Sequence, residues 1–235
     1  MKQLESNQDH KPETGFEYYE YKYLVEDARV PEVLQYLRSS ISNIDPYPDG
    51  WVSSLYYDSY DLKSFYECED GSNLKRKFRL RFYSNEDYSN GGQIQVKEKQ
   101  LSAVFKYKAP FPAQPVKDIL SQPWPEDIDS LAIRSLATNY VNLEPLILVQ
   151  YYRHRFRLFD NRITLDTRIS FQPGSLLRAP MRSYGHVPFS ILEVKAETPR
   201  PFLPTNKLID LPQLSFSKFY SGVKYLQGED EFFNK

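Results

Sequence analysis

The feature that most constrains the fold is a period-two alternation of polar and apolar residues that recurs along most of the chain. In KFRLRF (77–82), each Lys or Arg is followed by Phe or Leu. Similar alternation occurs around Ile94, in RITLDTRI (162–169) and in ILEVKAE (191–197). Such alternation is typical of strands with one buried face. It predicts strands near residues 17–25, 51–58, 74–83, 92–99, 102–109, 146–158, 161–171 and 187–198.

Fewer segments have helical spacing. Apolar residues predict a helix over 29–40, where Pro31 suits the first turn. Further helices are expected within 126–142, over 217–226 and, as a short element, over 61–69. The chain holds 17 Pro and only 9 Gly, and 40% of its residues are apolar, which argues against a doubly wound α/β enzyme. The prediction is an α+β fold, a closed eight-stranded antiparallel β-barrel with peripheral helices.

The 235 residues are expected to form one main domain over 16–226. Residues 1–15 are interpreted as a disordered N-terminal tail and 227–235 as a C-terminal tail. The chain contains no run of apolar residues long enough to span a membrane, and its N-terminal segment lacks the apolar core of a signal peptide. Cys68 is the single cysteine, so no disulfide framework is expected and the cytoplasm is the predicted location.

Positive charge is concentrated on one face of the predicted strands. Half of the chain's 30 lysines and arginines fall on the polar faces, although the formal net charge is only −1. The acids on these faces are Glu20, Asp166, Glu193 and Glu197. The opposite faces are apolar or aromatic and are expected to pack beneath the helices. The cations are Lys22, Lys75, Lys77, Arg79, Arg81, Lys97, Lys99, Lys106, Lys108, Arg153, Arg155, Arg157, Arg162, Arg168 and Lys195.

A dry barrel interior does not accommodate so many like charges, because desolvating each ion costs several kcal/mol. A water-filled interior that receives a polyanion resolves this conflict, and phosphate chains suit Arg and Lys best. Two other interpretations stay open: a solvated surface, and a nucleic-acid surface, which the pI near 6.3 disfavours. His10, His154 and His186 are too scattered for a zinc site, so any metal would be a hard cation on oxygen ligands.

Eight short motifs in order resemble one known family, over roughly residues 16–225. Together they resemble the VTC domain, the polyphosphate polymerase domain of the vacuolar transporter chaperone complex. That family belongs to the triphosphate tunnel metalloenzymes, which are closed eight-stranded barrels with phosphate-binding interiors. The motifs are YEYKYLV (19–25), SLYYDSYDLKSFYE (54–67), KFRLRFY (77–83), IQVKEK (94–99), YYRHRF (151–156), RITLDTRI (162–169), ILEVKAE (191–197) and SFSKFYSG (215–222).

The resemblance implies a reaction in which the terminal phosphoryl group of a nucleoside triphosphate is transferred to a polyphosphate chain, with Mn²⁺ or Mg²⁺. Positioning and charge neutralisation by a basic interior are sufficient for this chemistry. The expected catalytic residues are Lys22, Arg79, Arg81 and Glu193. The expected substrate-binding residues are Lys22, Arg79, Arg81, Lys97, Lys106, Lys108, Arg153, Arg162, Lys195 and Lys218.

By the same resemblance, Glu193 falls on the metal-ligand position, where a carboxylate is required. Glu193 could instead pair with charges on a neighbouring strand. Glu20 is either a second metal ligand or an ion-pair partner that fixes Lys22. Asp166, which has two arginines nearby, is expected to be a structural salt-bridge acid. Lys218 could also be a capping or surface lysine near the start of a helix.

Two departures from the family pattern reduce the number of carboxylates. The first strand of tunnel enzymes often reads ExExK, but Tyr18 stands where its first acid would be. Related VTC domains commonly have a carboxylate two residues before Lys97, where this chain has Gln95. Anion binding is therefore better supported than metal-dependent catalysis.

Two alternatives remain beside the polymerase. One is a hydrolase of triphosphate or polyphosphate on the same barrel, with water as the acceptor. The other is a non-catalytic sensor module that binds polyphosphate or nucleotide. The expected partners are a nucleoside triphosphate and polyphosphate and not nucleic acid, and export of a product would need a separate membrane partner.

Overall fold

The computed structural model describes residues 19–40, 45, 47–86, 88, 90–101, 103–114, 116–158, 161–174, 184–196 and 210–229. Nine strands form one antiparallel sheet of order β1-β9-β7-β6-β2-β3-β4-β5, and β8 pairs with β7. The strands are β1 (Tyr19–Glu26), β2 (Gly50–Asp58), β3 (Leu74–Phe82), β4 (Gly92–Gln100), β5 (Ala103–Phe111), β6 (Glu144–Leu158), β7 (Asn161–Pro173), β8 (Gly185–His186) and β9 (Phe189–Ala196). The helices are α1 (Val30–Ser40), α2 (Lys63–Glu69), α3 (Val116–Ser121), α4 (Leu131–Ala137) and α5 (Lys218–Leu226), with a 3-10 turn η1 (Asp27–Arg29) before α1.

The alternation in the sequence is confirmed as strand at all eight predicted positions; the last one corresponds to β9, and the two-residue β8 just before it was not predicted. The expected helices are present as α1, α2, α4 and α5, whereas α3 was not expected because its six residues are too few for a clear helical period. None of the described helices combines the length and the apolar character that a bilayer crossing requires. The predicted tail residues 1–15 and 230–235 lie outside the described residues.

The expected closure of the barrel is wrong. Among the described residues, β1 and β5 at the two edges of the sheet form no hydrogen-bonded ladder. The free edge of β1 is taken by a C-terminal segment: Leu24 N donates to Pro212 O (2.9 Å) and Leu214 N donates to Lys22 O (2.8 Å). At the other edge, β5 contains Pro110, which has no N–H to donate. Local features at each edge therefore oppose a continuous ladder.

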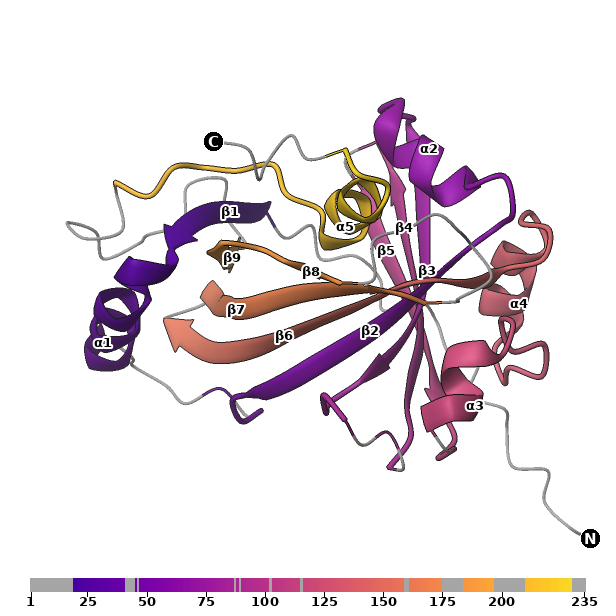
Figure 1. The fold of residues 1–235 in the computed structure, drawn as a ribbon, viewed down its shortest axis with the longest axis horizontal. Coiled ribbons are helices and arrows are strands. Elements are labelled where there is room, and N and C mark those ends of the chain that lie inside the picture. The colour runs from indigo at the N-terminus through magenta and orange to yellow at the C-terminus, as the bar shows by residue number, and fades with distance from the viewer. Residues whose placement is uncertain are drawn as a thin grey trace, which may run out of the picture.

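The sheet is strongly curled, and its outer face carries most of the apolar core. Figure 1 shows β2, β6 and β7 running across the view while β3, β4 and β5 are steeply inclined to them. We call inner the face that carries the alternate cations of β3, and outer the opposite face. On the outer face, Phe78 packs with Ile119 of α3 and Ile133 of α4. At the other end of the sheet, Val33 of α1 packs with Leu165 of β7.

Helix α5 covers one part of the inner face. Its residues Phe219 and Val223 join a cluster with Ile147 of β6 and Phe171 of β7. The close approach requires glycine at position 222, because a Cβ atom there would lie 2.6 to 2.7 Å from the same two strand side chains. The inner face is thus apolar where α5 packs and charged over the remainder.

Candidate functional site

Glu20 of β1 lies at the centre of a group of lysines on the inner face. Its carboxylate is 2.9 Å from Lys22 Nζ on the same strand and 3.8 Å from Lys195 Nζ on β9. It is also 3.9 Å from Lys97 Nζ on β4. Strands β1 and β4 belong to opposite ends of the sheet order. Side chains therefore bridge the two edges of the curled sheet although the backbones do not.

The lysines from β4 and β5 have strongly lowered pKa values. Burial and the neighbouring cations lower the pKa of Lys97 to about 8. Burial, together with the charges of Lys195 and Lys97, lowers the pKa of Lys106 to about 7. Like charges held together out of bulk water disfavour protonation. These ammonium groups are thus crowded with too few anions nearby, a condition that a bound polyanion would relieve.

Two carboxylates face the same space from neighbouring strands. Glu193 of β9 pairs in register with Lys22, and its carboxylate is 3.2 Å from Lys195 Nζ. Burial raises the pKa values of both acids, but the lysines and Arg153 hold the pKa of Glu193 well below its usual range. Lys97, Lys22 and Lys195 lower that of Glu20 to about 2. Both acids are therefore ionised at neutral pH.

A divalent cation fits this pair of acids if the substrate completes its ligands. Mg²⁺ is usually held by one or two carboxylates together with phosphate oxygens, and Glu20 and Glu193 supply that number. Within the described residues, no group of three or more His, Cys, Asp and Glu side chains is positioned to hold a metal. The protein would thus contribute two ligands and the phosphates the rest.

On β3, Arg79 is held by neutral partners on both sides. Its Nε and Nη2 atoms donate to Gln95 Oε1 on β4 at 3.0 and 2.7 Å. Its Nη1 atom donates to the Tyr56 hydroxyl on β2 at 2.9 Å. Gln95 Nε2 in turn donates to Gln93 Oε1 at 2.7 Å, which fixes the direction of the amide. These contacts orient the guanidinium without cancelling its charge.

Arg81, two residues along β3, is also held by hydroxyl groups. It donates to Ser54 Oγ at 3.2 Å and to the Tyr151 hydroxyl at 3.3 Å. Burial and the nearby Arg79 lower the pKa of Arg81, although a guanidinium remains protonated. Burial raises the pKa of Tyr56, but Arg79 and Arg81 with Lys77 outweigh it and lower the value to about 8. The lowered pKa of the Tyr56 phenol thus reflects an excess of positive charge around it.

A buried acid joins the sheet to helix α5. The Asp166 carboxylate of β7 is fully buried and accepts two hydrogen bonds from Arg153 of β6, at 2.6 and 2.8 Å. Lys218, the first residue of α5, places its Nζ atom 2.6 Å from Oδ2 of this carboxylate, which also accepts from Arg153. Asp166 is thus the structural acid that was expected, but its partners are Arg153 and Lys218 and not the neighbouring arginines in the sequence.

The start of α5 faces the cationic cluster. Ser217 caps the helix by accepting from Tyr220 N, and its hydroxyl also accepts from Lys77 Nζ at 2.8 Å. Lys22 Nζ donates to Phe216 O, just before the helix, at 2.9 Å. Lysines of β1 and β3 therefore attach the helix to the sheet from two directions.

Two of the expected site residues are paired in register with members of this cluster but are more exposed: Arg162 lies opposite Lys195, and Lys108 lies opposite Gln95. Arg162, at the start of β7, is 3.5 Å from Asp45 and its side chain is 42% exposed. Lys108 of β5 is exposed. They lie where they could attract an anion to the inner face but not enclose it. The structure brings the other ten together: Glu20, Lys22, Arg79, Arg81, Lys97, Lys106, Arg153, Glu193, Lys195 and Lys218.

Sequence reasoning missed the neutral residues that hold the arginines. Tyr56 and Tyr151 bond to Arg79 and Arg81, and Arg153 Cζ lies 5.1 Å from the Tyr151 ring centre. Both tyrosines alternate with outward-facing residues in their strands, so the face sorting that found the cations could have found them. Ser217, which accepts a hydrogen bond from Lys77 and not from an arginine, was missed as well, and only its place before a helix indicated it.

The site as a whole is a set of cations from six strands and one helix with few balancing anions. Three guanidinium groups are oriented by fixed partners, and lysines with lowered pKa values surround them. Such an arrangement binds several phosphate groups at once, because guanidinium forks grip pairs of oxygens while lysines follow the charge.

Comparisons with known proteins agree with this picture. A model of the VTC domain family matches residues 17–227. The structure is similar to the crystal structure of a protein from Bacillus halodurans provisionally described as an adenylate cyclase, with a TM-score of 0.52 and 12% identity over 77% of this chain and 81% of that chain. A protein from Vibrio parahaemolyticus with the same provisional description aligns over 90% of this chain and 87% of that chain, at 11% identity and a TM-score of 0.41. No curated protein matches. The first likeness shows the fold alone.

Proposed function

Because the chain belongs to the VTC domain family and its fold is similar to that of the Bacillus halodurans protein, we propose that it is a polyphosphate polymerase. Its inner face would bind a nucleoside triphosphate and transfer the terminal phosphoryl group to a polyphosphate chain. The observation that carries this proposal is the group around Glu20, where lysines from both ends of the sheet order meet two ionised carboxylates.

The chemistry asks little of the protein beyond position and charge. The acceptor is a terminal phosphate oxygen that is already ionised, so no general base has to remove a proton. One P–O bond to the nucleoside diphosphate breaks and one P–O bond to the polyphosphate chain forms. Negative charge spreads over the oxygens of the transferred group in the transition state. Fixed cations that face those oxygens stabilise it without reorganising.

The roles of the residues follow from how each is held. Arg79 and Arg81 are oriented by neutral partners and keep their full charge for phosphate oxygens. Arg153 is already engaged by Asp166, so it positions more than it neutralises. Lys97 and Lys106 gain protons when the anion arrives, because their lowered pKa values rise beside phosphate.

Glu193 and Glu20 would hold Mn²⁺ or Mg²⁺, which would neutralise part of the negative charge of the phosphates. Both carboxylates are ionised and face the same space from β1 and β9. Lys22 and Lys195 contact these acids now.

A non-catalytic binding module is the second candidate, and one observation favours it. Each of the two carboxylates already pairs with a lysine, Glu20 with Lys22 at 2.9 Å and Glu193 with Lys195 at 3.2 Å. Acids satisfied in this way could serve only to hold the lysines in place. Such a module would bind polyphosphate equally with or without Mn²⁺ and would turn nothing over.

The deciding experiment is incubation of the purified protein with ATP and Mn²⁺, with and without a short polyphosphate primer. Products are separated on gels, and released phosphate is measured. Long chains support the polymerase, whereas orthophosphate alone would make the protein a hydrolase. No product together with metal-independent polyphosphate binding would establish the binding module. The double variant Arg79→Ala/Arg81→Ala should lose activity, and Arg76→Lys on the outer face of the same strand is the matched control.

A further inference from the structure

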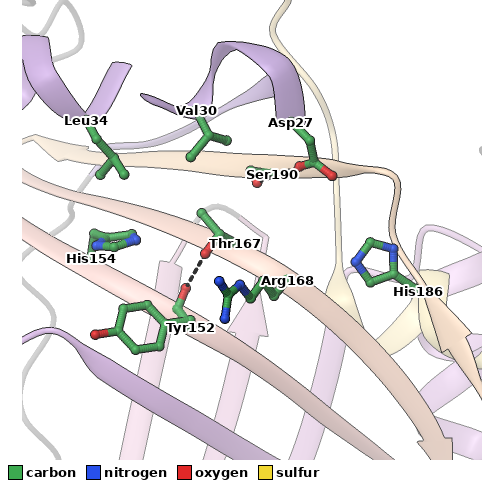
Figure 2. A pocket seen from close by; sticks show the side chains of 9 residues that line it. All are labelled: Asp27, Val30, Leu34, Tyr152, His154, Thr167, Arg168, His186 and Ser190. Carbon is green, nitrogen blue, oxygen red and sulfur yellow. Dashed lines mark hydrogen bonds between the residues drawn. The ribbon is translucent and has the colours of Figure 1, made fainter. Parts of the chain in front are cut away.

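A pocket of about 460 Å³ lies on the outer face of the sheet, away from the cationic cluster (Figure 2). Its floor is formed by β6, β7 and β9, where Tyr152 and Ser190 point away from the inner face. Asp27 of η1 and Val30 of α1 form the opposite wall. Cavities of this size suit small molecules. The residues that line it have no part in the function proposed above.

Arg168 enters this pocket because of an irregularity in the sheet. Between the pairs Gln150–Ser170 and Tyr152–Thr167, β6 has one residue and β7 has two. The register shift turns Arg168 to the outer face, although simple alternation places it among the inner cations. Its φ angle is +52°, a left-handed conformation that favours glycine. The conformation of the backbone would be met more easily by glycine, so it does not explain why an arginine stands here. Strained backbone of this kind often accompanies a functional site.

The guanidinium of Arg168 is exposed, and among the described residues no acid forms an ion pair with it. Asp27 also lines the pocket, but among the described residues neither it nor Asp49 forms an ion pair with Arg168. Asp27 Oδ1 accepts from Ser190 Oγ at 3.0 Å, and Asp49 Oδ2 lies 2.9 Å from His154 Nδ1. The pocket therefore presents one cation whose charge is not balanced by an ion pair.

The rest of the pocket is largely apolar and aromatic. Val30 and Leu34 of α1 line one side, and His154 and Tyr152 of β6 lie opposite them (Figure 2). The Tyr152 ring is held in place by Trp51, whose centre is 5.6 Å away in an edge-on arrangement. His154 contacts the same ring from the other direction at 5.0 Å. Aromatic side chains opposite aliphatic ones suit a ligand with a planar apolar ring.

We propose that this pocket binds a small organic anion. Its charged head pairs with Arg168, and its flat apolar body rests between Leu34, Val30 and Tyr152. The head is a phosphate or a carboxylate, since a guanidinium fork pairs with two oxygens of either group. The site is separate from the inner face, so it goes beyond the function proposed above and stands or falls independently of it.

Trp51 provides a local reporter. The chain has two tryptophans, and Trp124 lies in the core beneath α3 and α4. The variant Trp124→Phe therefore leaves a single tryptophan beside the pocket. Its fluorescence is followed while phenyl phosphate or benzoate is added, two probes with the same body and different heads. Inorganic phosphate, which has no body, is the ligand control.

At least one of the two probes should shift the Trp51 signal saturably, and inorganic phosphate should not. In the same background, Arg168→Gly suits the left-handed backbone and should weaken binding by roughly ten- to a hundredfold. Arg168→Lys should retain part of the affinity, and Arg38→Ala, an exposed arginine further along α1, should retain all of it. Unaltered affinity in Arg168→Gly would overturn the proposal. So would absence of any saturable response at millimolar concentrations, or loss of the response in Arg79→Ala/Arg81→Ala.

Discussion

Arg79 donates two hydrogen bonds to the side-chain amide oxygen of Gln95, at 3.0 and 2.7 Å, across the β3–β4 pair. A carboxylate at this position would form an ion pair of the same geometry and cancel the arginine's charge. The amide gives the same orientation and leaves the charge available. The departure from the family pattern at Gln95 thus has a physical meaning: it favours a strong grip on anions.

The variant Gln95→Glu tests this directly. We expect metal-free polyphosphate affinity to fall by about tenfold, because Arg79 would then be paired with a carboxylate. Isothermal titration calorimetry measures the change. Gln100→Glu adds the same charge to the exposed end of the same strand and should have little effect. If the two variants lose the same polyphosphate affinity, the loss comes from the added net charge and not from the pairing of Arg79.

Tyr56 should titrate well below the ordinary pKa of a tyrosine. Burial would raise its pKa, but Arg79, Arg81 and Lys77 lower it to about 8. Phenolate absorbance should therefore rise near pH 8, and Tyr56→Phe should remove that step. A lowered folded-state pKa makes ionised Tyr56 stabilising: this contribution is complete above its ordinary value of 10.0 and is lost as the pH falls through about 8. Bound polyphosphate should move the step to higher pH. A step that persists in Tyr56→Phe contradicts the assignment.

Lys106 should make polyphosphate binding pH-dependent. Its pKa is lowered to about 7, first by burial and then by Lys195 and Lys97, with Glu20 acting in the opposite direction. Above pH 7, Lys106 must therefore take up a proton from the solvent when the anion binds. The affinity for polyphosphate without metal should accordingly fall as the pH rises. Lys106→Arg keeps its charge at all these pH values and should flatten the profile.

Calorimetry in buffers with different ionisation heats counts the protons taken up on binding. Lys99→Arg, at the exposed end of β4, is the matched control and should leave the profile steep. If Lys106→Arg and the parent protein take up the same number of protons, another group is responsible.

Asp166 should be essential for the attachment of α5. Its removal leaves Arg153 and Lys218 without an anion in a buried site. We expect Asp166→Asn to lower the free energy of unfolding by roughly 3 to 5 kcal/mol. Added polyphosphate should restore more stability to this variant than to the parent, since it supplies the missing negative charge.

Thermal denaturation with and without polyphosphate measures both effects. Glu69→Gln is the control, because Glu69 contacts Lys224 of the same helix at 3.4 Å in a partly exposed pair. Such pairs contribute about 0 to 1 kcal/mol. Similar losses in the two variants would show that burial of Asp166 has no special effect.

Glu193 separates binding from turnover. Glu193→Gln should lower the rate of polyphosphate synthesis by at least about a hundredfold. Metal-free polyphosphate affinity should stay the same or increase, because a negative charge leaves the inner face. Gel analysis of products and calorimetry on the same preparation give the two readouts. Undiminished synthesis would remove Glu193 from metal binding, and parallel loss of both properties would indicate misfolding.

The alternation of polar and apolar residues predicted the strands well because one face of each strand is buried and the other is not. Successive residues therefore have to alternate in polarity. The alternation placed Lys77, Arg79 and Arg81 on one face, where the structure has them. It failed at Arg168, because a single extra residue in β7 turns the side chain over and leaves no mark in the pattern.

Closure of the sheet could not be predicted for a different reason. The alternation in β1 does not specify which backbone occupies its outer edge, and here Pro212 and Leu214 occupy it. The apolar part of the inner face was missed as well. Ile147 and Phe171 lie on the same face as the cations, and only the docking of α5 explains them. Long-range partners of this kind are absent from any local pattern.

The pairing of β1 also has a consequence for the order in which the protein is made. Lys22 bonds to Phe216, 194 positions later, and the segment beside β1 leaves the ribosome just before it. Contacts so distant in sequence form late and slowly. The first strand must therefore wait until residues 212–216 have been made. A nascent chain that has not yet reached them lacks the assembled group around Glu20.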